Sequence, residues 1–144
     1  VEDNAYAIMR TKSGTVAMLH SSATQWRHRF SLEITLEKGA LIMSGILSGS
    51  KSYGSETLTI VQASEDDRGD PDEETFSYDQ DPSWANEIDE FSKAILDDRP
   101  IIHGSSADAL RSMALVYRIY CADPVWRDKW NLSVENSTKN NDAD

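Results

Sequence analysis

Apolar and polar residues alternate along the first half of the chain, with the two-residue period of strands. The clearest example is Ser31 to Leu36, where leucine and isoleucine alternate with serine, glutamate and threonine. Successive strand residues point to opposite faces, so this segment predicts a strand with one buried face, as is typical of antiparallel sheets. Glu37-Lys38-Gly39 interrupts the run, which predicts a short hairpin whose turn uses the positive φ that Gly39 allows.

The same alternation occurs on both sides of this hairpin. Residues 5–10 alternate, and a Lys-Ser-Gly turn joins them to a second predicted strand over residues 15–24. The spacing loosens among the glycines of residues 44–57, which indicates a bulged or short strand. Alternation returns at Leu58 and Ile60, and the whole pattern predicts five or six strands.

The second half of the chain changes to a helical period. Asp81-Pro82-Ser83 is typical of a helix start with proline in the first turn. The apolar residues that follow recur at three- and four-residue spacing, so we expect one stripe of this helix to be buried. This stripe comprises Trp84, Ile88, Phe91, Ile95 and Leu96.

A second amphipathic helix follows the capping-box pattern of Ser105 and Asp108, and we expect it to end near Asp123-Pro124. Strands first and helices later predict an α+β fold. We expect an open, mainly antiparallel sheet of five or six strands with the two principal helices packed on one face. In the tail, the tryptophans predict a final turn docked on the body, and residues 131–144 are expected to be frayed.

Composition narrows the classes of partner. The chain has 144 residues, enough for one domain with a core, and 25 acidic against 14 basic residues give a formal charge of −11. That charge opposes nucleic acid backbones and anionic lipid surfaces, so neither is expected as a main partner. The sequence contains no apolar run long enough to span a membrane and no secretory signal pattern. The single cysteine, Cys121, is interpreted as a small core residue. A single unpaired cysteine fits a reducing compartment, so we expect a cytoplasmic protein.

Two features that are often functional carry little weight here. His20 and His103 have no partners at metal-ligand spacing, so no metal site is predicted. The acidic run from Glu65 to Glu74 lacks the ordered spacing of a calcium-binding loop and predicts a solvated loop.

The candidate binding residues are Trp26, Arg27, His28 and Arg29, an aromatic and basic corner before the strand at Ser31. An indole offers a flat apolar face to a sugar ring, arginines donate to hydroxyls, carboxylates or phosphates, and imidazole both donates and accepts. We therefore predict a substrate-binding corner, for which a carboxylated or nucleotide-linked substrate would explain both arginines. The structural alternative is that the tryptophan caps the sheet and the arginines pair with carboxylates.

Several short motifs, in this order and spacing, resemble the C-terminal domain of the Gfo/Idh/MocA oxidoreductases over roughly residues 1–122. They are Glu2-Asp3-Asn4-Ala5-Tyr6-Ala7, the Lys-Ser-Gly hairpin, residues 32–41, and the helix pair around residues 87–91 and 107–110. The resemblance implies a nicotinamide-dependent dehydrogenase or reductase acting on a sugar, inositol or related polyol derivative. It implies a substrate-binding and oligomerisation domain over residues 1–123 and a partly disordered extension over 124–144.

The resemblance also implies that the catalytic parts lie elsewhere. NAD or NADP would be bound by an N-terminal Rossmann domain absent from this chain, and the family's catalytic lysine and histidine would lie upstream of Val1. Gly45, Gly49 and Gly54 do not have the spacing of a dinucleotide fingerprint. The start at Val1, without methionine, fits a fragment, so we expect no catalytic residue, no cofactor site and no hydride transfer in this chain alone.

In the family, this sheet supplies part of the substrate pocket, and alignment places Trp26 and His28 at substrate-contacting positions. It also supplies the oligomer interface, so we expect a homodimer or tetramer through the sheet face. The competing interpretations are a stand-alone dimeric α+β module that binds a small molecule without enzymatic activity, and a degenerate oxidoreductase serving as a regulatory or transport subunit. Leu36 stands where many relatives have glycine, so the substrate, the choice of NAD or NADP and the reaction direction stay open.

Overall fold

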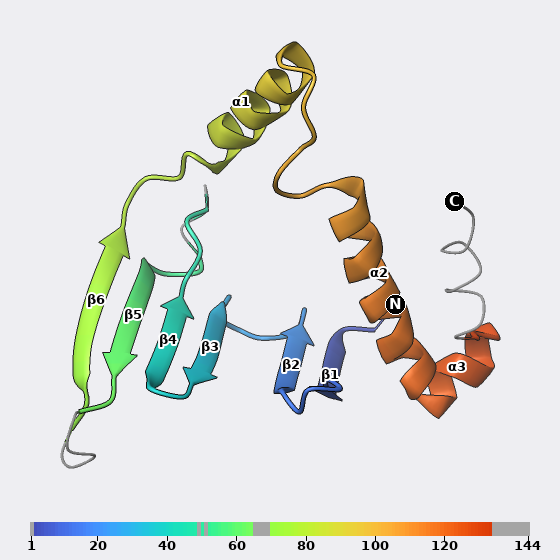
Figure 1. The fold of residues 1–144 in the computed structure, drawn as a ribbon. Coiled ribbons are helices and arrows are strands. Elements are labelled where there is room, and N and C mark those ends of the chain that lie inside the picture. The colour runs from blue at the N-terminus through green and yellow to red at the C-terminus, as the bar shows by residue number, and fades with distance from the viewer. Residues whose placement is uncertain (1, 49, 51, 65–69, 134–144) are drawn as a thin grey trace. The chain divides into compact units, whose positions relative to one another are not determined.

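The computed structural model describes residues 2–48, 50, 52–64 and 70–133 and contains six strands and three helices (Figure 1). The strands form two antiparallel sheets, a hairpin of β1 and β2 and a four-stranded sheet in the order β3-β4-β5-β6. The α+β class and the predicted number of strands are confirmed, although the strands are divided between two sheets. The strands are β1 (Asn4–Arg10), β2 (Val16–Ser22), β3 (Ser31–Leu36), β4 (Gly39–Ser44), β5 (Glu56–Gln62) and β6 (Asp72–Tyr78).

The predicted hairpin joins β3 and β4. Leu36 pairs with Gly39 across the two-residue turn Glu37-Lys38, and β4 then pairs with β5 along its whole length. Gly39 has a φ of +156°, and a Cβ atom built on it would lie 2.0 Å from the carbonyl oxygen of Val61 in β5. Glycine is therefore needed at this position because two backbones approach closely, in addition to its place in the turn.

The last strand of this sheet corrects the interpretation of the acidic run. Residues 72–74 belong to β6 and pair with the end of β5, so this part of the run is a strand and not a loop. Thr59 and Thr75 face each other across the two strands, with their hydroxyl oxygens 2.9 Å apart. Strand pairing at the C-terminal end of the run therefore outweighs the repulsion between its charges. Residues 65–69 of the run lie outside the described residues.

The β4–β5 connection differs from the prediction. Its described residues form no strand, so the expected bulged or short strand is wrong. The chain turns out of β4 at Gly45, which has a φ of +75° and donates its backbone N–H to the carbonyl oxygen of Phe30 at 3.1 Å. A Cβ atom on Gly45 would lie 2.1 Å from the carbonyl oxygen of Ser55, so the connection closes tightly on itself.

The chain divides into two compact units. One contains Val1–Ala5 and His20–Glu87, and with them the four-stranded sheet; the other contains Tyr6–Leu19 and Ile88–Asp144. In the second unit, the β1–β2 hairpin closes through a hydrogen bond from the Thr11 N–H to the Thr15 carbonyl oxygen at 2.9 Å. Partly buried and exposed residues alternate along β1, which confirms the predicted two-residue period.

Both predicted helices are present: α1 (Ser83–Leu96) begins at Ser83, directly after the proline expected in its first turn, and α2 (Ser106–Ala122) ends near Asp123-Pro124 as predicted. α2 starts with the complete capping box of Ser105 and Asp108. α2 ends at Asp123, whose carboxylate then caps α3 (Pro124–Trp130) by accepting from two backbone N–H groups. Local capping signals therefore fix both ends of α2.

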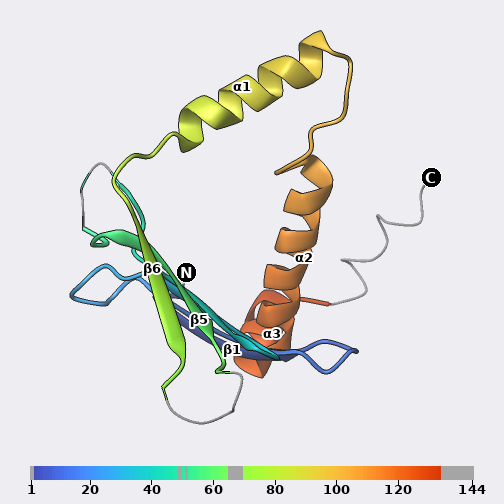
Figure 2. The same cartoon turned by 60° about the vertical axis from the view of Figure 1, so that its left-hand side comes forward.

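The predicted final turn is a short helix, α3, which contacts the end of α2. Figure 2 shows α3 beside the end of α2, and the ring centres of Trp126 and Tyr120 are 5.5 Å apart. The Ser133 N–H donates to the Tyr117 hydroxyl at 3.3 Å. Cys121, near this junction, is only 6% exposed, in agreement with its predicted place in a core. Residues 134–144, which include most of the predicted frayed tail, lie outside the described residues.

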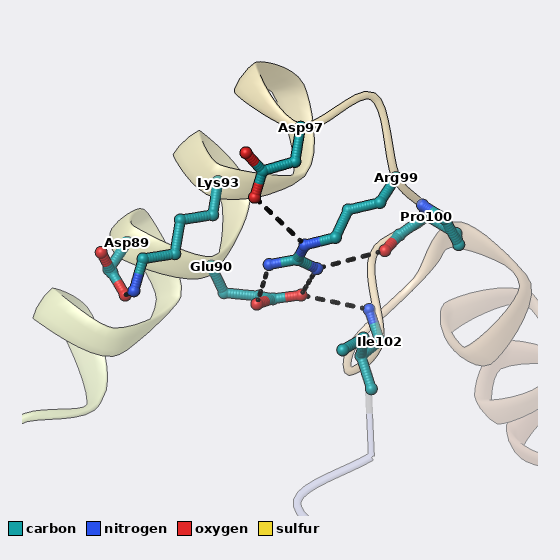
Figure 3. A network of polar contacts seen from close by, with 7 residues as sticks. All are labelled: Asp89, Glu90, Lys93, Asp97, Arg99, Pro100 and Ile102. Atoms are coloured by element: carbon teal, nitrogen blue, oxygen red, sulfur yellow. Dashed lines mark hydrogen bonds and ion pairs between the residues drawn. The ribbon is translucent and has the colours of Figure 1, made fainter.

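A polar network holds the segment that follows α1 (Figure 3). Arg99 forms two hydrogen bonds with the Glu90 carboxylate, each 2.8 Å long, and the Ile102 N–H donates to the same carboxylate at 3.3 Å. These hydrogen bonds, first of all those from Arg99, lower the pKa of Glu90 to about 2. The network therefore ties the chain after the helix back onto the helix.

Few apolar residues are buried. Among the described residues, the buried apolar side chains are Ala94 and Cys121, whereas the apolar stripe of α1 is exposed. Burial of one face of β3 and of the α1 stripe, as expected from the periodicity, is therefore not observed, because burial requires a covering surface as well as an apolar face. Packing of the helices on the sheet stays a prediction.

The apolar face of the four-stranded sheet is nevertheless continuous. Leu32, Met43, Leu58 and Phe76 are directly opposite one another across all four strands. Opposed residues on neighbouring strands share a face of the sheet.

None of the helices in the described part of the chain is both long enough and apolar enough to cross a membrane.

Candidate functional site

Three connecting segments meet at one end of the four-stranded sheet (Figure 1). Ser31 at the start of β3 pairs with Ser44 at the end of β4, and Glu56 at the start of β5 pairs with Tyr78 at the end of β6. The loop before β3, the β4–β5 connection and the segment after β6 therefore all leave the sheet at the same end. We call this end the corner; it contains the four predicted binding residues.

His28 is the predicted residue with the most contacts in the corner. Its Nδ1 lies 2.9 Å from the Ser52 hydroxyl oxygen, and its ring centre lies 5.1 Å from that of Tyr53, with the rings tilted by 50°. Ser52 is in turn 2.8 Å from Ser50, which is 3.2 Å from Ser48. The β4–β5 connection thus supplies a chain of three hydroxyls that ends on the imidazole.

The other three predicted residues are exposed. Trp26 has a relative exposure of 105%, so it caps nothing in the described chain. Arg27 and Arg29 are exposed, and neither forms an ion pair with a described carboxylate. The side chains of this loop are therefore available to a ligand, although only His28 has a contact that fixes it within the corner.

A cavity of about 590 Å³ lies at the same end of the sheet. The β4–β5 connection contributes Leu47 and Ser48, and the segment after β6 contributes Asp79 and Asp81. Glu56 holds the connection in place, because its carboxylate accepts a hydrogen bond from the Leu47 N–H at 2.8 Å. Ser48 belongs both to the cavity wall and to the hydroxyl chain, so the two features are continuous.

Asp81 is held in its ionised form. Hydrogen bonds from the side chain and the backbone of Ser83 lower the pKa of Asp81 below its ordinary value. The backbone bond, from the Ser83 N–H, is 3.0 Å long. An ionised carboxylate accepts hydrogen bonds and donates none, so this side of the cavity suits a ligand rich in hydroxyl donors.

The serines, Tyr53 and the two aspartates of the corner were not predicted. Residues 44–57 contain many serines and glycines, a composition typical of loops that carry hydrogen-bonding side chains. Because a strand was expected in these residues, they were not considered as a loop with binding side chains. The contact between His28 and Ser52 joins residues 24 positions apart, and no local pattern reveals such a contact.

The corner combines groups that recognise polyhydroxylated molecules. Hydroxyls and an imidazole exchange hydrogen bonds with ligand hydroxyls, carboxylates accept them, and an exposed indole provides an apolar face. Within the described ranges, no three His, Cys, Asp or Glu side chains form a group suited to a metal ion. A nicotinamide cofactor does not fit the β6–α1 connection, residues 79–82, which has no glycine and carries two carboxylates that would repel a pyrophosphate.

No family model, curated protein or solved structure matches the chain.

Proposed function

We propose that the chain is the substrate-binding and oligomerisation domain of a cytoplasmic, nicotinamide-dependent oxidoreductase that acts on a sugar, inositol or related polyol. The observation that carries this proposal is the hydroxyl chain from Ser48 to His28, whose loop also contains the exposed Trp26. A polyol exchanges its hydroxyl hydrogen bonds with such a chain, while the C–H face of a sugar ring packs on indole. The resemblance to the Gfo/Idh/MocA C-terminal domain supplies the oxidoreductase part of the proposal.

In this proposal the corner binds and orients the substrate and takes no part in hydride transfer. His28 and Ser52 hold a ligand hydroxyl, and Asp81 accepts from a second one. Arg27 and Arg29 extend specificity toward substrates with a carboxylate or phosphate, because a guanidinium binds either group through two parallel hydrogen bonds. The nicotinamide and the groups that move protons would belong to a separate Rossmann domain.

Substrate binding by the corner is tested with this chain and a panel of polyols. We expect inositol, glucose or glucuronate to shift the backbone amide NMR signals of residues 26–29 and 52–54. Replacing His28 by alanine should weaken binding about threefold to tenfold, since it removes one or two neutral hydrogen bonds. Replacing Trp26 by alanine should weaken binding about tenfold, because the apolar platform is lost.

The matched control for His28→Ala is His103→Ala, which removes another exposed histidine outside the corner. It should leave polyol affinity unchanged. Equal effects of the two substitutions, or shifts that map outside the corner, would refute the substrate site.

The oxidoreductase part is tested separately, with the full product of the gene that encodes this chain. We expect reduction of NAD or NADP when that protein is mixed with the polyol that binds the corner, and a lower kcat/KM for Trp26→Ala. Polyol binding without cofactor reduction would contradict the oxidoreductase proposal. That result would favour the alternative, a dimeric small-molecule-binding module without enzymatic activity.

A further inference from the structure

A second cavity lies within the other compact unit, between the β1–β2 hairpin and the C-terminal half of α2. It has a volume of about 880 Å³. Residues 6–12 line it from the hairpin, and Leu115, Arg118, Ile119 and Ala122 line it from the helix. The helical residues recur at three- and four-residue spacing, so they share one face of α2. We call this cavity the groove.

The groove collects basic side chains in an acidic chain. Arg10, Lys12 and Arg118 line it, whereas Asp123 is the single carboxylate among its lining residues. The Asp123 carboxylate is already engaged, since it accepts from the Val125 N–H at 2.8 Å and from the Trp126 N–H at 3.2 Å. The groove therefore carries an excess of positive charge although the formal charge of the chain is −11.

The three groove cations differ in their pairing from four other basic residues of the second unit. Lys93, Arg99, Arg111 and Arg127 each form an ion pair with a carboxylate of the second unit. None of the three groove cations does so among the residues that the structure describes. Because acidic residues outnumber basic ones in this chain, three unpaired cations in one cavity represent an unused capacity for binding an anion.

The remainder of the groove wall is apolar. Ile8 is 78% exposed and Leu115 is 44% exposed, and both line the groove beside Ile119. Apolar side chains exposed in a concave surface favour a ligand with an apolar part. The groove therefore offers cations for one end of a ligand and hydrocarbon for the other, and its volume is within the usual range of about 300–1,000 Å³ for small-molecule sites.

We propose that the groove is a second binding site, for a small organic anion with an apolar body. Arg10, Lys12 and Arg118 hold its carboxylate or phosphate, and the isoleucines contact its hydrocarbon part. This site is separate from the polyol-binding corner, because every residue that lines it belongs to the other unit. It does not depend on the proposed oxidoreductase activity.

The proposal is tested by isothermal titration of the chain with phenyl phosphate, benzoate and inorganic phosphate. We expect phenyl phosphate to bind more tightly than inorganic phosphate, because only the aryl anion also contacts the apolar wall. Comparison with benzoate distinguishes a phosphate from a carboxylate as the preferred head group. Raising the salt concentration should weaken binding of all three anions.

The test variant is Arg118→Met, which keeps the length of the aliphatic side chain and removes its charge. We expect it to weaken phenyl phosphate binding at least tenfold, as is typical for the loss of hydrogen bonds to a charged group. The matched control is Arg127→Met on α3, which removes the same charge from a residue that pairs with Asp128 and does not line the groove. This control should bind as the unsubstituted chain does.

Three results would overturn the proposal. The first is equal loss of binding in Arg118→Met and Arg127→Met, which would indicate a general effect of charge. The second is equal affinity for phenyl phosphate and inorganic phosphate. The third is tighter binding of a short peptide of alternating glutamate and phenylalanine than of any small anion, which would make the groove a peptide-docking surface. If Arg118→Met fails to fold, Lys12→Met in the hairpin turn serves as the second variant.

Discussion

Two glycines with similar positive φ angles have different surroundings, and they illustrate two different reasons for a glycine at a position. Gly45 and Gly54 flank the β4–β5 connection with φ values of +75° and +85°. A Cβ atom on Gly45 would meet the Ser55 carbonyl oxygen at 2.1 Å, whereas one on Gly54 would have no atom within 4 Å. Gly45 therefore serves close packing in the corner, whereas Gly54, which lines the cavity, is needed for its backbone conformation and not for close packing.

This pair gives a direct prediction. Gly54→Ala should lower the free energy of unfolding by about 1–2 kcal/mol, the cost of placing a side chain in the left-handed region. Gly45→Ala carries the same cost and about 1–3 kcal/mol more for the steric overlap. Urea denaturation of the two variants measures the difference. Equal destabilisation would contradict the close approach of Gly45 and Ser55.

In the corner, the chemistry of single residues was predictable from the sequence, but their contacts were not. The loop with Trp26 and His28 was predictable, since aromatic, basic and imidazole side chains adjoin in the sequence. The partners of His28 were not, because they come from a connection whose path depends on the pairing of β4 with β5. Side-chain chemistry is readable locally, whereas the neighbours of a side chain depend on the assembled sheet.

At the scale of elements, local signals located both predicted helices and the central hairpin. Both helices and the hairpin turn of β3 and β4 lie where periodicity and capping residues predict them, because caps and turns are decided by a few adjacent residues. The exceptions are the β4–β5 connection, where the described residues do not form the expected strand, and β6, in which Asp72, Glu73 and Glu74 join a sheet despite their charge. Pairing with β5 stabilises that strand, and pairing is not visible in a charge pattern.

The capping box of α2 provides a test with adjacent residues. The Ser105 hydroxyl accepts from the Asp108 N–H at 3.2 Å, while the next residue, Ser106, already belongs to the helix. Ser105→Ala should lower the free energy of unfolding by about 1 kcal/mol, the usual cost of losing a cap. Ser106→Ala should change it by no more than a few tenths. Thermal unfolding followed by circular dichroism distinguishes them, and a reversed order would refute the capping assignment.

The segment after α1 makes stability depend on pH. The pKa of Glu90 is lowered from 4.5 to about 2, so the folded chain holds this group ionised where the unfolded chain protonates it. Its contribution is fully present above pH 4.5 and is lost as the pH falls toward 2. The unfolding free energy of Glu90→Gln should accordingly fall less steeply over that interval. Glu87→Gln, a neutralisation elsewhere in α1, should keep the original pH dependence, and identical profiles for all three proteins would contradict the Glu90–Arg99 assignment.

At the scale of the whole molecule, the distribution of apolar side chains points to a covering surface. Leu32, Met43 and Phe76 lie in one row across the four-stranded sheet and are each about 40% exposed. The sequence predicts which face of each strand is apolar, but it does not say what covers that face. The proposed homodimer or tetramer would bury this row against a second copy.

Sedimentation equilibrium tests that assembly. We expect the chain to self-associate, and Phe76→Lys to shift the population toward monomers, because a charge in a buried apolar interface is costly. Ser77→Lys adds the same charge to the opposite face of β6 and should leave the association unchanged. A monomer at all concentrations, or equal effects of the two substitutions, would refute association through this face.

The buried position of Cys121 has a practical consequence. It is the single cysteine of the chain, and its thiol lies at the junction of α2 with α3. A thiol reagent can modify it only while that junction is open, so the labelling rate reports how often the end of α2 separates from its neighbours. The unaltered chain thus contains an intrinsic probe of local opening, next in sequence to groove residues Ile119 and Ala122. A ligand that occupies the groove should lower the rate at which Cys121 is labelled.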